Sequence, residues 1–298
     1  MSKSIRKRIE RLSATAARLA DEHDLEAVHD FRVAARRLSE MLWLWKPILR
    51  APDADRFRRR LRQQRRALGP LREIEVHLEL LKLLSASSHA AFSGLTTDLE
   101  RRHRRERRAA ARAAGGLRAA PREAWLDLGG PPGWDHARSQ IEARHDRLRS
   151  RVSRAFERAR VRASDTRLHE ARIALKRWRY AIESLEEAGV PDTERAGLDE
   201  LATVQETLGA VQDLSTLAGR LRQRRSRALR PIQLQVLIGL EKRRAVAHRA
   251  VARWLEVARS IQAVPAPPRQ RRTTRRDVPV DGETDRERGA RSEEKPGG

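Results

Sequence analysis

The chain has 298 residues, with 65 lysines and arginines against 41 aspartates and glutamates, a formal net charge of +24. Residues 1–262 retain 56 of the basic and 34 of the acidic residues, so the excess charge belongs to the part expected to fold. Such a charge predicts an anionic partner: nucleic acid, an acidic membrane surface, an acidic protein or an inorganic polyanion. The absence of cysteine excludes disulfides and thiolate metal sites.

Hydrophobic periodicity predicts helices along most of the chain and no alternating strand pattern. In the first half, helices are expected over about 4–22, 25–49, 53–84 and 88–114, with a break or kink at Gly69–Pro70. In the second half they are expected over about 135–162, 165–188, 193–227 and 231–261, with an interruption near Gly209. The fold class is therefore expected to be all-α, two four-helix units in tandem.

Glycine and proline punctuate this helical pattern in two places. A linker is expected over about 117–134, which divides the folded part, residues 1–262, into halves of about 1–116 and 135–262. Residues 263–298 lack periodicity and are expected to form a disordered, charged tail. No apolar run of about 18 residues could span a membrane, and the charged N-terminus lacks a signal core, so a cytoplasmic location is expected.

An internal repeat stands out within the two halves. The segment from His29 to Arg37 (HDFRVAARR) recurs 140 residues later, from His169 to Arg177 (HEARIALKR). A Leu–Gly pair recurs at the same offset, at Gly69 and Gly209, with an acidic residue four positions further on. Two blocks that share one offset without a gap predict an internal duplication.

On a helical wheel, each copy of the repeat has a basic face opposite an apolar face. We call these two segments the ladder helices. Their basic faces comprise His29, Arg32 and Arg36 in the first copy and His169, Arg172, Lys176, Arg179 and Tyr180 in the second. Arg37 and Arg177 lie off to one side. Glu73 and Asp213 are expected to pair with ladder arginines.

Closely spaced cations repel one another unless an anion lies across them. A linear polyphosphate matches two such ladders, since it offers dense charge and oxygen acceptors but no bases to read. The alternatives are an ordinary solvated face, a nucleic-acid-binding protein that contacts phosphates, and a phosphohydrolase. No P-loop, nucleophile elbow, zinc-protease motif or acidic cluster for Mg²⁺ is present, so we expect a binding protein with no catalytic residue, metal or cofactor.

The segments HDFRVAARRL (29–38) and HEARIALKRWRYAIE (169–183), with LGPLRE (68–73) and LGAVQD (208–213), resemble the conserved histidine α-helical domain (CHAD) family over roughly residues 1–262. The resemblance implies a stand-alone form with two four-helix bundles related by a pseudo-twofold axis. It also implies binding of inorganic polyphosphate in a basic channel, and association with polyphosphate granules in some members. The residues implied as channel lining are His29, Arg32, Arg36, Arg37, His169, Arg172, Lys176, Arg177, Arg179 and Tyr180. The first ladder is shorter, because Ser39 and Glu40 occupy the places of Arg179 and Tyr180.

Overall fold

A computed structural model describes residues 2–21, 24, 26–49, 51–84, 89–114, 134–190, 198–223 and 229–263. The prediction of an all-α fold is confirmed: across the described residues all regular structure is helical. The first half holds α1 (Ser2–Arg18), α2 (Ala27–Leu44), a short 3-10 turn η1 (Lys46–Ile48), α3 (Ala51–Ala67), α4 (Gly69–Leu84) and α5 (His89–Ala114). The second half holds α6 (Trp134–Val161), α7 (Asp165–Glu187), α8 (Leu198–Gln223) and α9 (Arg230–Ala263).

The predicted linker and tail lie outside the described residues, except for their edges in α6 and α9. No helix in the described part of the chain combines the length and the apolar character needed to cross a bilayer.

The two Leu–Gly blocks behave differently. The helix expected over 53–84 is broken at the first block, where α3 ends at Ala67 and α4 begins at Gly69, as predicted. Pro70 has no backbone N–H to continue the helical hydrogen bonding, and it suits the first turn of α4. The interruption predicted at Gly209 is wrong, because α8 runs through it without a break. No proline follows Gly209, and the buried Leu208 and Val211 hold this stretch against the core, so the cost of one helical glycine is offset.

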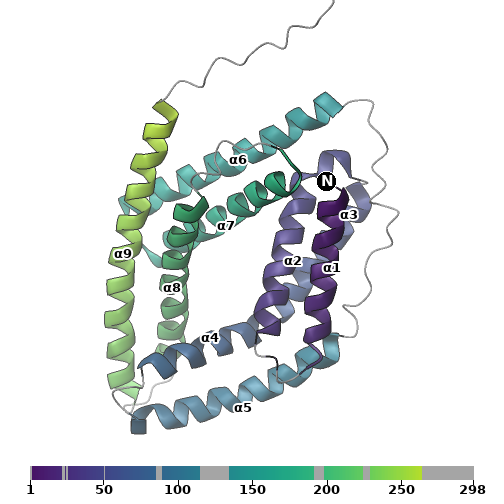
Figure 1. The fold of residues 1–298 in the computed structure, drawn as a ribbon. Coiled ribbons are helices and arrows are strands. Elements are labelled where there is room, and N and C mark those ends of the chain that lie inside the picture. Colours follow the sequence, from purple (N-terminus) through teal and green to yellow (C-terminus); the bar gives the residue numbers. More distant parts are fainter. Residues whose placement is uncertain are drawn as a thin grey trace, which may run out of the picture.

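The helices pack in neighbouring layers that together form a four-sided frame (Figure 1). In the first half, α2 packs between α1 and α3, and α4 packs on α5. In the second half, α7 packs between α6 and α8, and α9 contacts both α8 and α6. The halves meet where α2 contacts α7 and where α4 contacts α8. The two ladder helices, α2 and α7, are therefore neighbours in space.

Two arginines join α2 to α7 through equivalent positions. Arg37 forms an ion pair with Glu183 at 3.0 Å and stacks on Tyr180, 5.7 Å from the ring centroid. Arg177 forms an ion pair with Glu40 at 3.0 Å and stacks on Trp43 at 5.1 Å. Subtracting the offset of 140 maps one set of contacts onto the other. We call this pair of contacts the arginine clasp, and its reciprocity fits the predicted pseudo-twofold relation.

The apolar faces of both ladder helices are buried, as the wheel predicts. Phe31 and Leu38 of α2 and Trp45, which directly follows it, are at most 1% exposed, and Ile182 of α7 is fully buried. One polar contact crosses this core: the indole N–H of Trp45 donates a hydrogen bond to Ser184 Oγ at 2.7 Å.

Replacing Ser184 with alanine should lower the free energy of unfolding by about 1–3 kcal/mol, because the buried indole N–H loses its acceptor. Urea denaturation of Ser184→Ala measures the loss, and Ser139→Ala on the exposed face of α6 is the control. In a Trp45→Phe background the Ser184→Ala change should cost distinctly less, since no donor remains. Equal losses in the two backgrounds would contradict the assignment.

Candidate anion-binding cavity

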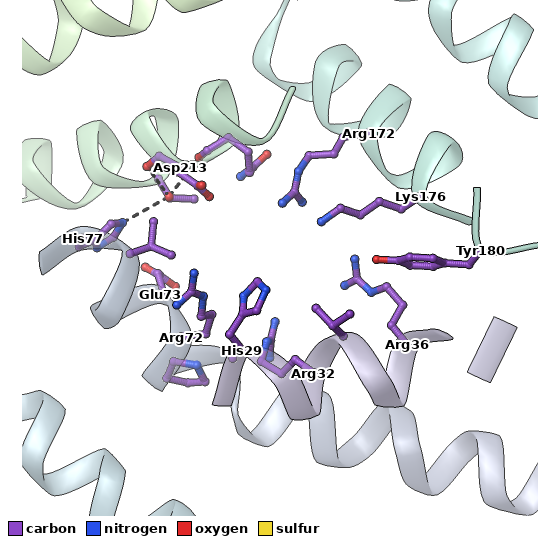
Figure 2. A pocket seen from close by; sticks show the side chains of 16 residues that line it. His29, Arg32, Arg36, Arg72, Glu73, His77, Arg172, Lys176, Tyr180 and Asp213 are labelled. Atoms are coloured by element: carbon purple, nitrogen blue, oxygen red, sulfur yellow. Dashed lines mark hydrogen bonds between the residues drawn. The ribbon is translucent and has the colours of Figure 1, made fainter. Parts of the chain in front are cut away.

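A cavity of about 580 Å³ lies where α2, α4, α7 and α8 meet (Figure 2). The two ladder helices form opposite walls, and the helices of the two Leu–Gly blocks complete the lining. Its walls carry five lysine or arginine side chains against two carboxylates. The lining comprises His29, Arg32, Val33, Arg36, Gly69, Pro70, Arg72, Glu73, Val76, His77, Arg172, Lys176, Tyr180, Gln212, Asp213 and Thr216.

The structure brings six of the ten predicted site residues to this cavity. His29, Arg32 and Arg36 reach it from α2, and Arg172, Lys176 and Tyr180 reach it from α7. They converge because the helical period places them on one face of each helix, and the arginine clasp holds the two faces opposite each other. The ring of Tyr180 is only 3% exposed.

The other four predicted residues lie outside the lining. Arg37 and Arg177 are used in the arginine clasp, and Arg179 forms an ion pair with Glu183 at 3.3 Å. His169 is half-buried one turn before Arg172 and does not reach the cavity. A helical wheel cannot distinguish these four residues from those that line the cavity. It shows the direction of a side chain but not which helix packs opposite it.

The four remaining cations of the ladder faces have no such partners. Among the described residues, no carboxylate forms an ion pair with Arg32, Arg36, Arg172 or Lys176. Arg32 donates a hydrogen bond to the backbone oxygen of Arg65, and the Nε of Arg172 is buried without a partner. The ladder arginines beside the cavity are therefore ion-paired, with Arg37 and Arg179 sharing Glu183, whereas the four ladder cations that face the cavity are not. Arg72 of α4, which also lines the cavity, is paired with Glu75 at 3.3 Å.

Sequence reasoning missed several lining residues on α4 and α8. Arg72 lies within the quoted LGPLRE block, so its position between Gly69 and Glu73 was the available signal. His77 is fully buried, with its Nε2 3.3 Å from Thr216 Oγ1. Burial and the charge of Arg220 lower the pKa of His77 to about 4, so its ring is neutral at physiological pH. No sequence pattern marks His77 or Thr216, whose meeting depends on how α4 packs on α8.

The two repeated glycines make room for the ladder arginines. A Cβ on Gly69 would lie 3.8 Å from Arg32 Nη1, and a Cβ on Gly209 would lie 3.6 Å from Arg172 Nε. Each glycine thus lies beneath the ladder arginine of its own half. A methyl group would fit at either position, whereas a larger side chain would push the guanidinium away from the wall. Each half thus places its repeated glycine in the same position relative to its ladder arginine.

The two carboxylates in the lining do not share one role. Glu73 pairs with Arg220 of α8 at 2.8 Å, so the expectation that it pairs with a ladder arginine is wrong. The meeting of α4 and α8 places Arg220 beside it, which the sequence did not indicate. Burial raises the pKa of Asp213, while the charges of Arg172 and Lys176 act against that rise. Asp213 therefore faces the second ladder and offsets part of its charge, but among the described residues it does not form the expected ion pair with a ladder arginine.

Desolvation and mutual repulsion lower the pKa of several cations around the cavity. Burial, with the charges of Arg172 and Arg36, lowers the pKa of Lys176 to about 6. Burial, with Arg36 and Arg72, lowers the pKa of Arg32 to about 10. The pKa of His29 is also lowered, by desolvation and by Arg72. An anion in the cavity would reverse the repulsion and favour the charged forms.

Replacing Lys176 with methionine should stabilise the protein when no anion is bound. Because the pKa of Lys176 is about 6 in the folded protein and about 10.4 in an unfolded chain, the unfolded state binds more protons between these values. The wild-type free energy of unfolding should therefore rise with pH across this window. The advantage of Lys176→Met should be largest below pH 6 and vanish towards pH 10.4, in urea titrations at several pH values. Lys242→Met, at an exposed position of α9, is the control, and a pH-independent difference would refute the assignment.

The comparisons with known proteins agree with this architecture. The family model for the CHAD domain matches residues 3–222. The crystal structure of the CHAD domain from the plant Ricinus communis aligns with a TM-score of 0.59 and 24% sequence identity, over 87% of this chain and 89% of that chain. PptA from Streptomyces chartreusis aligns with a TM-score of 0.47 and 17% identity, over 87% of this chain and 99% of that chain. A search of curated proteins finds no match.

At 24% identity the Ricinus communis structure supports the fold alone. The family match carries more, because it covers well over half of the chain and includes both ladder helices and both Leu–Gly blocks. The cavity is thus built from the segments that the family model recognises, and this chain belongs to the CHAD domain family.

Proposed function

We propose that this chain binds inorganic polyphosphate in the cavity between α2, α4, α7 and α8, and that it does so without hydrolysing the polymer. The observation that carries the proposal is the division among the basic residues of the ladder helices. Arg37, Arg177 and Arg179, which lie beside the cavity, are ion-paired, whereas Arg32, Arg36, Arg172 and Lys176, which face it, have no carboxylate partner among the described residues.

Partly buried cations without carboxylate partners cost stability, and an anion that enters the cavity would offset that cost. Guanidinium groups offer planar, forked donors that match phosphate oxygens. Arg36 and Arg172 reach the space from opposite walls (Figure 2). A chain of phosphates between them would accept hydrogen bonds from both halves. The CHAD family is linked to polyphosphate, which agrees with this ligand.

The lining favours polyphosphate over nucleic acid. Proteins that bind single-stranded nucleic acid usually stack bases on aromatic side chains. In this cavity Tyr180 is almost fully buried, and its ring is flanked by Arg37 and Arg179, with centroid distances of 5.7 and 5.5 Å. It is therefore not available as a stacking platform. Binding of this kind would also bring the protein to polyphosphate granules where a cell contains them.

The variant Arg172→Ala/Lys176→Ala should bind long-chain polyphosphate about a hundredfold more weakly than wild type, since two charge-assisted contacts are lost. Isothermal titration calorimetry at one fixed ionic strength measures the change. The matched control is Arg104→Ala/Arg105→Ala, which removes the same charge from exposed positions of α5. We expect the control to bind nearly as tightly as wild type.

Equal losses in the two variants would show that only net charge matters and would refute the cavity as the site. Competition provides a second criterion in the same assay. Single-stranded DNA that displaced polyphosphate at equal phosphate concentration would favour a nucleic-acid-binding protein instead.

Polyphosphate incubated with the protein and Mg²⁺ or Mn²⁺ should release no orthophosphate above the protein-free rate. The physical reason lies in the carboxylates, because Glu73 is engaged with Arg220 and Asp213 faces the cations of the second ladder. A colorimetric phosphate assay checks the expectation. Release that disappears in Glu73→Gln or Asp213→Asn would establish an enzyme and overturn this part of the proposal.

A further inference from the structure

Lys176 differs from an ordinary surface lysine in its surroundings. Its side chain points into the cavity from α7, one turn after Arg172 and opposite α2 (Figure 2). The charged groups that influence it are Arg172 and Arg179 on its own helix, Arg36 and His29 on α2, and Asp213 on α8. It forms no ion pair with a described residue, whereas Lys46 pairs with Asp55 at 2.6 Å.

These surroundings favour the uncharged amine. Burial has the largest effect on the amine, and four of the five neighbouring groups are cationic or become cationic on protonation, so the pKa of Lys176 falls to about 6. At physiological pH the amine nitrogen therefore has a free electron pair. Lysine amines desolvated beside another cation are activated nucleophiles in this way. Because the side chain lines the cavity, a small molecule that enters can reach it.

The same cavity holds donors that would orient a small phosphate compound next to this amine. Arg172 and Arg36 lie beside it, and neither forms an ion pair with a described residue. A volume of about 580 Å³ equals that of roughly twenty water molecules, enough for a two-carbon acyl phosphate with its hydration. Binding would place the reagent's phosphate on the guanidinium groups, with its acyl carbon within reach of the amine.

We propose that Lys176 is a modification site, acylated without an enzyme by small acyl phosphates that bind to the cavity's arginines. The amine's electron pair attacks the acyl carbon and forms a C–N bond. The bond between that carbon and the phosphate oxygen breaks, and its electron pair leaves with orthophosphate. The amine proton passes to the departing phosphate, so the products are an amide on Lys176 and hydrogen phosphate. Arg172 and Arg36 stabilise the leaving group's charge as it develops.

Acylation would also regulate the cavity. The amide can no longer be protonated, so one of the cations available to a bound polyanion is removed, and the acyl group occupies part of the space. Polyphosphate affinity should therefore fall when Lys176 is acylated. This consequence rests on the proposed function, whereas the acylation itself does not.

The test uses the full-length protein and acetyl phosphate at pH 7.5, with site occupancy measured by peptide mass spectrometry. Lys176 should be acetylated about tenfold faster than the exposed Lys242 of the same molecule, because its far larger neutral fraction outweighs its lower intrinsic reactivity. Its rate should change little between pH 7 and 9, where ordinary lysines become steadily more reactive. A rate for Lys176 at or below that of Lys242 would overturn the proposal.

A second comparison isolates the role of the arginines. Acetic anhydride acylates amines but carries no phosphate, so the ratio of the two reagents' rates at Lys176 is independent of the amine's ionisation. We expect Arg172→Ala to lower this ratio and Arg104→Ala to leave it unchanged. An unchanged ratio in Arg172→Ala, in a protein shown to be folded by circular dichroism, would refute guidance by the cavity's arginines.

Protection experiments separate this proposal from the proposed function. Orthophosphate should slow acetylation by acetyl phosphate, because it competes for the same guanidinium groups. Polyphosphate should protect Lys176 at far lower phosphate concentration. If orthophosphate protects and polyphosphate does not, the modification site stands and the polyphosphate proposal fails. If polyphosphate binds tightly but Lys176 is not preferentially acetylated, the reverse holds.

Discussion

The arginine clasp between α2 and α7 is the contact on which the cavity depends. Arg37 and Arg177 each reach across to the opposite ladder helix, and each contacts an acidic residue and an aromatic ring there. Half-buried ion pairs and cation–π contacts of this kind are individually modest. Their importance is geometric, because together they hold two cationic helices face to face that would otherwise repel each other.

That arrangement divides the basic residues of the ladder helices into two groups. The clasp arginines and Arg179 are paired with two carboxylates, Glu183 and Glu40. The ladder cations that face the cavity have no carboxylate partner among the described residues. Placing these partly buried cations around one shared cavity lowers the pKa of Arg32, Arg172 and Lys176. The apolar faces behind them offset the cost, since Phe31, Leu38 and Ile182 are almost completely buried. The unpaired cations thus lower the free energy of unfolding, and burial of the apolar faces raises it, a common compromise at functional sites.

Helix positions and the candidate ladders were largely predictable, because helical periodicity is a local property of the sequence. The failed predictions concern contacts between helices. Gly209 was expected to interrupt α8, but packing of its neighbours against the core keeps the helix continuous. Glu73 was expected to pair with a ladder arginine, but α8 places Arg220 beside it, and these two residues form the ion pair instead. His77 and Thr216 carry no pattern at all, and only the packing of α4 on α8 brings them to the cavity.

The sequence by itself determined the helical class, the two basic faces and their common offset of 140 residues, because each depends only on side-chain type and helical period. It also pointed to an anionic partner, since the excess charge could be counted. Tertiary structure alone decided which of those cations face a shared cavity and which are neutralised. Whether a given cation lines the cavity or forms an ion pair depends on which residue the packing of the helices places opposite its side chain. Arg36 and Arg37 are adjacent in sequence, yet one lines the cavity and the other is held by Glu183.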